Sequence, residues 1–183
     1  MDIEWVEVLG GTCMYGDNSK PITVRTLLWT RTPVTYGQLG LEHGVRGLHP
    51  VTRITHAEAV DVAGDLGGRL PTSVEWEWMA GGPSRRRWPW GDQEWTPRLA
   101  NLRDSGVDTT SPVNACTEGA TPQGLLDVAG NVWEWTWRTT TGGAIVRGGS
   151  YASIPLYAQT TFLNAAPTEL ASPGIGLRAV RTA

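Results

Sequence analysis

The chain has 183 residues, a charged fraction of 18% and a formal net charge of −3. This length suits one domain with a single substantial core, so we expect one domain over residues 1–183. The weak net charge gives no reason to expect nucleic acid or an anionic membrane as a partner. No apolar run reaches the roughly 18 residues of a membrane span, and no signal pattern opens the chain, so we expect a cytoplasmic protein.

The aromatic and glycine content is unusual, with ten tryptophans, 23 glycines and one phenylalanine. Tryptophans separated by glycine and proline turns indicate many short irregular segments packed on large aromatic side chains, with little regular helix. Cys13 and Cys116 have no CxxC spacing, so two reduced thiols are expected. A single disulfide between them is the alternative.

The first regular elements predicted are two strands, at residues 3–8 and 22–28. We expect them to pair antiparallel through a polar loop at residues 15–21. A short helix is predicted over residues 35–42, which follow Pro33 and precede Gly44.

Two capping boxes predict two consecutive helices. Thr55 and Glu58 open the first, and Thr72 and Glu75 open the second, because each pair can satisfy the free amides at a helix start. Paired glycines, at 67–68 and 81–82, end them. Strands followed by helices indicate an α+β fold.

Residues 83–122 are rich in proline, glycine and polar side chains. A loop this long in a compact domain is normally functional or pinned in place, and Trp88, Trp90 and Trp95 are candidate pins. Further strands are predicted at residues 144–146 and 175–180, the last returning to the sheet. The spacing of His43, His49 and His56 matches neither a helical ligand pair nor a zinc motif, which favours structural roles.

The stretch at residues 124–136 interleaves carboxylates, glycines and tryptophans. Gly130 allows a sharp turn between Asp127 and Glu134, so that the two carboxylates and nearby carbonyl oxygens could surround a calcium ion. In the alternative, a bent strand pair, these carboxylates cap backbone amides. The local sequence leaves both interpretations open.

Six ordered motifs give the chain a resemblance to a known family. They are RLPTSVEWE at 69–77, WPWGD at 88–92, ANL at 100–102, GLLDVAGNVWEW at 124–135, RGGSY at 147–151 and GLR at 176–178. In this order the chain resembles the formylglycine-generating enzymes, or sulfatase-modifying-factor domains. The resemblance implies a C-type-lectin-like α+β fold with low regular secondary structure.

The resemblance also implies structural calcium. It assigns ligands to the side chains of Asp127 and Glu134 and to the carbonyl oxygens of Gly130 and Val132. A second calcium site would start at Asn101 and Leu102. Its acidic partner would be one of two nearby carboxylates, Asp104 and Asp108.

The family's activity transfers less readily. The resemblance places a copper(I)-binding cysteine pair three and eight residues after Ser150, where this chain has Ser153 and Ala158. Neither a hydroxyl nor a methyl group replaces a thiolate ligand, so formylglycine formation and a copper or iron cofactor are not expected. No confident catalytic residue is assigned.

A ligand-binding groove is the part of the site that we expect to be kept. The resemblance places five residues in or under it: Trp133, Ser150, Ser153, Tyr157 and Ala158. In a purely structural alternative, Trp133 belongs to the core and Ser150 to a turn. Such a groove is the default binding site of a domain.

Three functions therefore stay open. The first is a calcium-stabilised module that binds a protein or peptide-like ligand, as variable proteins or immunity proteins do, with residues 152–174 as the displayed segment. The second is an enzyme with altered, metal- and oxygen-dependent oxidative chemistry in the same groove. The third is an inert structural domain.

Overall fold

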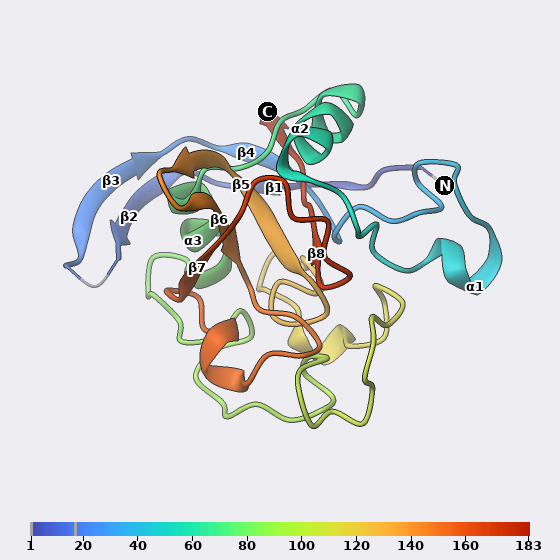
Figure 1. Ribbon diagram of the computed structural model, residues 1–183. Coiled ribbons are helices and arrows are strands. Elements are labelled where there is room, and N and C mark those ends of the chain that lie inside the picture. Colours follow the sequence, from blue (N-terminus) through green and yellow to red (C-terminus); the bar gives the residue numbers. More distant parts are fainter. Residues whose placement is uncertain (1, 17) are drawn as a thin grey trace.

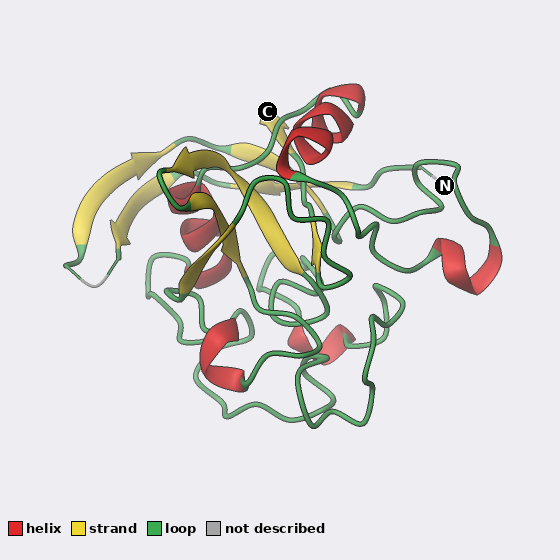
Figure 2. Ribbon diagram, viewed as in Figure 1, coloured by secondary structure: helices red, strands yellow, loops and turns green. Residues whose placement is uncertain are grey.

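The fold consists of short strands and helices joined by long irregular segments (Figures 1 and 2). It is known from a computed structural model, which describes residues 2–16 and 18–183. The strands are β1 Trp5–Val8, β2 Gly11–Tyr15, β3 Lys20–Val24, β4 Leu27–Thr30, β5 Trp133–Thr140, β6 Gly143–Arg147, β7 Leu163–Ala166, β8 Ile175–Gly176 and β9 Val180–Thr182. The helices are α1 Gly44–Gly47, α2 His56–Asp65 and α3 Ser73–Gly81, with 3₁₀ turns η1 Thr117–Gly119 and η2 Pro155–Ala158. This is the predicted α+β class.

The strands form three sheets. β1 and β9 both pair antiparallel with β4, β2 and β3 form a hairpin, and the third sheet has the order β7-β6-β5-β8 with β8 parallel to β5. The predicted strand at residues 22–28 is therefore divided, because its first half pairs with β2 and its second half with β1. The loop predicted at residues 15–21 is shorter in the structure, because Tyr15 ends β2 and Lys20 begins β3, and its residue 17 lies outside the described residues.

Both predicted capping boxes are present. The Thr55 amide donates to Glu58 Oε2 at 2.7 Å, and the Glu58 amide donates to the Thr55 hydroxyl at 3.3 Å. Thr72 and Glu75 repeat this exchange at the start of α3. The structure thus confirms both helix starts, because a capping box is complete within four residues of the sequence.

The short helix predicted at residues 35–42 is wrong. These residues form turns, and Thr35 bridges Pro50. The Thr35 amide donates to Gln38 Oε1 at 2.9 Å, and the Gln38 amide donates to the Thr35 hydroxyl at 3.2 Å. Gly40 has φ +69°, outside the helical region, and α1 follows a few residues later.

Tryptophans fill the core, as the composition predicts. Trp29, Trp76, Trp88 and Trp135 are each at most 1% exposed, and they are distributed over three hydrophobic clusters. In the irregular segment at residues 83–122, Trp88 stacks on Trp90 at 5.3 Å between ring centroids. Aromatic side chains therefore pin this segment, as expected.

The strands predicted near the C-terminus are present with altered bounds. Residues 144–146 lie in β6, and residues 175–180 are divided between β8 and the start of β9. β9 does return to the first sheet, beside β4. Both cysteines are buried free thiols, so the disulfide alternative is not formed.

No helix in the described part of the chain combines the length and apolar character needed to cross a membrane. A cytoplasmic location stays a prediction.

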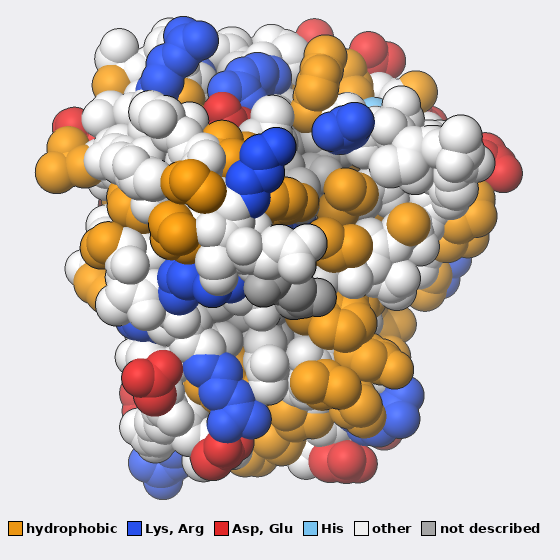
Figure 3. Space-filling model, turned by 90° about the vertical axis from the view of Figure 1, so that its left-hand side faces the viewer, with side chains coloured by type: hydrophobic (Ala, Val, Ile, Leu, Met, Phe, Trp, Pro, Cys, Tyr) orange, Lys and Arg blue, Asp and Glu red, His pale blue; other side chains and the backbone are white. Residues whose placement is uncertain are grey.

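On the side of the β2–β3 hairpin, hydrophobic side chains are interspersed with basic and acidic ones over the surface (Figure 3).

Candidate functional site

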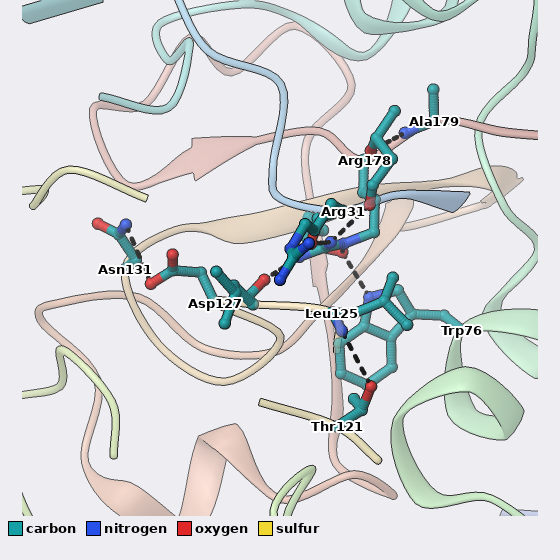
Figure 4. Close-up of polar contacts among 11 residues, drawn as sticks. Arg31, Trp76, Thr121, Leu125, Asp127, Asn131, Arg178 and Ala179 are labelled. Atoms are coloured by element: carbon teal, nitrogen blue, oxygen red, sulfur yellow. Dashed lines mark hydrogen bonds and ion pairs between the residues drawn. The ribbon is translucent and has the colours of Figure 1, made fainter. Parts of the chain in front are cut away.

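A buried ion pair between Glu134 and Arg178 holds the middle of the molecule together. The Glu134 carboxylate accepts from the Trp76 indole at 2.6 Å and lies 2.9 Å from Arg178 Nη2. Arg178 also donates to the carbonyl oxygens of Thr30 and Leu126, at 2.8 Å and 2.7 Å (Figure 4). Both side chains of the pair are at most 1% exposed, so these bonds replace the water that the charges lose.

A second buried ion pair joins β6 to α3. Arg147 Nη2 lies 2.6 Å from Glu77 Oε2 and donates to the Ser73 carbonyl at 3.1 Å, while Nη1 donates to the Phe162 carbonyl at 2.7 Å. Gly148 follows with φ +93°, and a Cβ there would lie 2.7 Å from the Val128 carbonyl oxygen. The motif at residues 147–151 thus anchors the chain just before it enters the site.

Asp127 is a buried carboxylate with an unpaired oxygen. Its Oδ1 accepts from the Asn131 amide group at 3.4 Å, whereas Oδ2 has no hydrogen-bond partner among the described residues. Burial raises the pKa of Asp127 to about 8, although the Arg178 charge opposes the rise. Asp127 and Asn131 lie together on one side of Arg178 (Figure 4). A buried oxygen without a donor is the kind of group that a cation satisfies.

The other residues of the predicted first calcium site are arranged unequally around Asp127. Gly130 and Val132 lie in one tight turn, where the Val132 amide donates to the Gly130 carbonyl at 2.8 Å. The Glu134 side chain is bound to Trp76 and Arg178. Of the two carboxylates, Asp127 therefore keeps an oxygen that is unpaired among the described residues, while Glu134 neutralises an arginine. Calcium at this turn stays a prediction.

The residues of the predicted second calcium site order a loop. Asn101 Oδ1 accepts from the Ser105 hydroxyl at 2.9 Å, and its amide group donates to the Thr109 carbonyl at 2.9 Å. The Leu102 carbonyl accepts from the Ser105 amide at 3.0 Å. The two candidate acidic partners, Asp104 and Asp108, are exposed.

A groove of about 300 Å³ lies where β5, β6 and β7 meet the segment before β8. It is lined by Trp133, Val146, Ser150, Tyr151, Ala152, Asn164, Ala165, Ala166, Pro167, Leu170, Ser172, Pro173, Gly174 and Ile175. Two of the predicted groove residues, Trp133 and Ser150, are among them. The Ser150 hydroxyl also accepts from the Ala152 amide at 3.3 Å, so it supports the turn as well.

Ser153, Tyr157 and Ala158 are not among the residues that line this groove. The Ser153 hydroxyl accepts from the Ser150 amide at 3.0 Å, and Ala158 is buried beside Gly149. Tyr157 packs on Phe162 at 4.8 Å between ring centroids. Of the three, Ser153 thus contacts the lining residue Ser150, and any direct contact of these residues with a ligand stays a prediction.

Most of the groove wall was not identified in the sequence. Tyr151, Asn164, Leu170 and Ser172 line it, and all except Tyr151 lie within the segment 152–174 that was singled out as a whole. No periodicity distinguishes individual positions in this segment, because most of it is irregular. Tyr151 is the exception, because it is the last residue of the motif at residues 147–151.

The groove carries no thiol, imidazole or carboxylate among the described residues that line it. Cys13 and Cys116 lie elsewhere, and burial raises the pKa of each thiol to about 11. No cluster of three or more histidine, cysteine or acidic side chains suited to a metal occurs in residues 2–16 and 18–183. The polar groups of the groove are the hydroxyls and amides of Ser150, Tyr151, Asn164 and Ser172.

A larger and more apolar hollow, of about 500 Å³, lies between the β2–β3 hairpin and the start of α3. Its lining includes Tyr15, Ile22, Val74, Trp137 and Ile145. None of the groove residues that the family motifs identify lies there. We therefore take the groove beside Trp133 as the candidate functional site, although it is the smaller of the two.

The profile of the sulfatase-modifying factor enzyme 1-like domain matches residues 37–183. The hercynine oxygenase of Mycobacterium tuberculosis is 33% identical over 160 residues, which cover 74% of this chain and 37% of that protein. The formylglycine-generating enzyme of the same organism is 40% identical over 103 residues, covering 50% and 34%. The chain therefore spans about a third of the length of these relatives.

Among solved structures, Treponema denticola variable protein 1 is similar over nearly the whole chain. The TM-score is 0.83 at 19% sequence identity, covering 98% of this chain and 95% of that one. At this identity the similarity shows the fold alone. The predicted C-type-lectin-like fold is confirmed.

Proposed function

The chain belongs to the sulfatase-modifying factor enzyme 1-like family, and from this premise we propose that it is a binding module for a protein or peptide-like ligand. One observation carries the proposal. A groove lies beside Trp133 and Ser150, and among the described residues that line it none is a thiol, imidazole or carboxylate that could hold a soft metal or activate a hydroxyl as a nucleophile. Binding is the function that such a lining still supports.

The chemistry of the groove suits a peptide. Trp133 and Tyr151 are partly exposed and supply apolar area with few rotatable bonds, which suits a binding surface. The exposed Asn164 supplies both an amide donor and an acceptor for a main-chain group of the ligand. The fold match to a protein named a variable protein supports a display role for residues 152–174.

We further propose that calcium stabilises the frame under the groove. The support is the unpaired Oδ2 of Asp127, together with the turn at Gly130 and Val132, which the Asn131 amide group joins to Asp127 Oδ1 at 3.4 Å. A bound ion would neutralise the buried carboxylate and hold this turn against Asn101, whose carbonyl accepts from the Asn131 amide at 2.8 Å. Asp127 would be the charged ligand and the turn would supply neutral oxygens.

An oxidative enzyme is the second candidate, and the similarity to a hercynine oxygenase over 160 residues favours it. In that case the reactive metal ligands would have to come from outside the groove lining of this chain, because Ser153 and Ala158 occupy the positions that the family resemblance gives to cysteines. The matches cover 37% and 34% of these two relatives, so such ligands would lie outside the segment that this chain shares with them.

One experiment separates the two candidates. A cysteine-containing peptide of the kind that sulfatases carry is incubated with the protein, copper(I) and oxygen, and the peptide is analysed by mass spectrometry. A binding module leaves the cysteine of the peptide unchanged. A variant in which Cys13 and Cys116 are replaced by alanine is the control for oxygen consumed by the protein's own thiols. Conversion to an aldehyde, or oxygen uptake that depends on the protein, would contradict the proposal.

A further inference from the structure

A polar pocket of about 330 Å³ lies next to the groove, and Pro173 lines both. Its polar lining includes Tyr36, Arg46, His49, Thr52, Arg53 and Thr110. We call this hollow the cationic pocket. Among the described residues that line it, two carry a guanidinium group and none carries a carboxylate, and the one carboxylate paired with them, Glu42, lies outside the lining.

Arg53 has a backbone that is fixed and a side chain that is free. Its φ is +58°, an uncommon conformation for a residue with a Cβ, and its amide donates to the Ser172 carbonyl at 2.9 Å. The guanidinium makes no hydrogen bond or ion pair with any residue in the described ranges. The Ser172 bond connects this arginine to the wall of the groove, where Ser172 is also a lining residue.

Arg46, on α1, is only weakly neutralised. Its Nε lies 3.3 Å from Glu42 Oε1, and the side chains are 76% and 42% exposed, a setting in which ion pairs contribute little. The other two guanidinium nitrogens have no partner in the part of the chain that the structure describes. Arg46 therefore offers the two parallel donors that suit an oxyanion.

The remaining polar groups are held in place and can donate. His49 Nδ1 lies 2.9 Å from the Thr110 hydroxyl, which fixes the ring, while Nε2 has no partner in the described ranges. The Tyr36 hydroxyl lies 3.2 Å from the hydroxyl of Thr52, a residue that is only 9% exposed. Burial and the charge of Arg46 lower the pKa of His49.

We propose that the cationic pocket binds an oxyanion, a carboxylate or phosphate group, held by Arg46 and Arg53 with His49 Nε2 as a third donor. Guanidinium groups recognise both anions through paired N–H donors, and the pocket has room for one such group with its first substituent. The inference does not depend on the ligand of the groove, because these donors belong to a separate cavity.

The test follows the three histidines by NMR. Inorganic phosphate and acetate are titrated separately into the full chain, and the imidazole signals of His43, His49 and His56 are recorded against pH. A bound anion favours the imidazolium form, so each saturating anion should raise the pKa of His49 alone. His43, which lies outside the pocket, and His56, whose Nε2 lies 2.9 Å from the Thr136 carbonyl oxygen, serve as internal controls.

Two variants make the result specific. Arg53→Gln should weaken anion binding by about tenfold or more, the loss expected for a charge-assisted bond. Arg138→Gln, which removes an exposed arginine far along β5, should leave it unchanged. A large preference for phosphate would assign a phosphoryl ligand, and a large preference for acetate would assign a carboxylate. The proposal is overturned if neither anion shifts His49, if His43 shifts equally, or if Arg53→Gln binds as the wild type does.

Discussion

Replacing Asp127 by asparagine removes a charge and keeps the shape of the side chain. Asp127 is 3% exposed, and its Oδ2 has no hydrogen-bond partner among the described residues. Because burial raises its pKa to about 8, from an ordinary value of 3.8, the folded protein without metal holds a proton that the unfolded chain releases. Asp127→Asn removes this difference, because an amide does not titrate in this range.

The sign and size of the effect follow from linkage. Between the two pKa values the unfolded state binds fewer protons than the folded state, so the stability of the metal-free protein falls as pH rises. The slope is at most about 1.4 kcal/mol per pH unit, which amounts to roughly 3 kcal/mol between about pH 5 and pH 7.5. For a chain of this size that is about 6–12 °C in Tm.

Calcium should reverse this dependence. The ion binds the ionised carboxylate, so a concentration about a hundredfold above Kd adds about 2.7 kcal/mol of stability and the gain grows toward alkaline pH. Thermal unfolding is measured with chelator and with calcium from pH 5 to pH 8, for the wild type, Asp127→Asn and Asp104→Asn, which probes the predicted second site, with the exposed Asp61→Asn as the control. In chelator at alkaline pH, Asp127→Asn should melt above the wild type, and it should lose the part of the calcium gain that grows toward alkaline pH.

Two results would refute this reasoning. A wild-type Tm that follows the Asp127→Asn curve across the whole pH range in chelator would show that the buried carboxylate carries no raised pKa. A calcium gain that persists in Asp127→Asn but is lost in Asp104→Asn would place the ion at the exposed loop. The first result concerns protonation and the second concerns the metal, so the two parts can fail separately.

Three further predictions concern the frame. Glu134→Gln should cost about 3–5 kcal/mol in urea unfolding, because it leaves Arg178 buried without a counter-charge, and a loss under 1 kcal/mol would contradict this. Gly148→Ala should destabilise by about 1–3 kcal/mol, through its left-handed φ and a close backbone oxygen, whereas a neutral effect would show that the turn adapts. A thiol reagent should leave Cys13 and Cys116 unmodified until the chain unfolds, because both are buried and burial raises their pKa to about 11.

Local signals in the sequence predicted the parts of the fold that depend on neighbouring residues. The capping boxes at Thr55 and Thr72 each involve residues three apart, so both helix starts could be placed. The break after Val24 could not, because it depends on which strand each half pairs with. Alternation of side chains continues across both halves, and the hairpin is decided by tertiary pairing.

In the candidate site, too, features set by neighbouring residues differ from features set by distant contacts in how far the sequence predicts them. The family resemblance places Trp133 and Ser150 in a groove, and both line the cavity beside β5. The partner of Glu134 could not be predicted, since Arg178 is 44 residues away and the sequence does not show whether a carboxylate faces a cation or an arginine. Asn164 and Ser172 were missed because binding positions in largely irregular segments follow no period.

The most direct test of the binding module compares two tryptophans of one strand. Peptides selected by display on the wild-type protein are titrated calorimetrically against Trp133→Ala and Trp137→Ala. Both residues lie in β5, but Trp133 lines the groove while Trp137 is 51% exposed and lines the separate apolar hollow. We predict that Trp133→Ala weakens binding by about thirtyfold and that Trp137→Ala binds as the wild type does. Peptides that lose affinity only with Trp137→Ala would contradict the account.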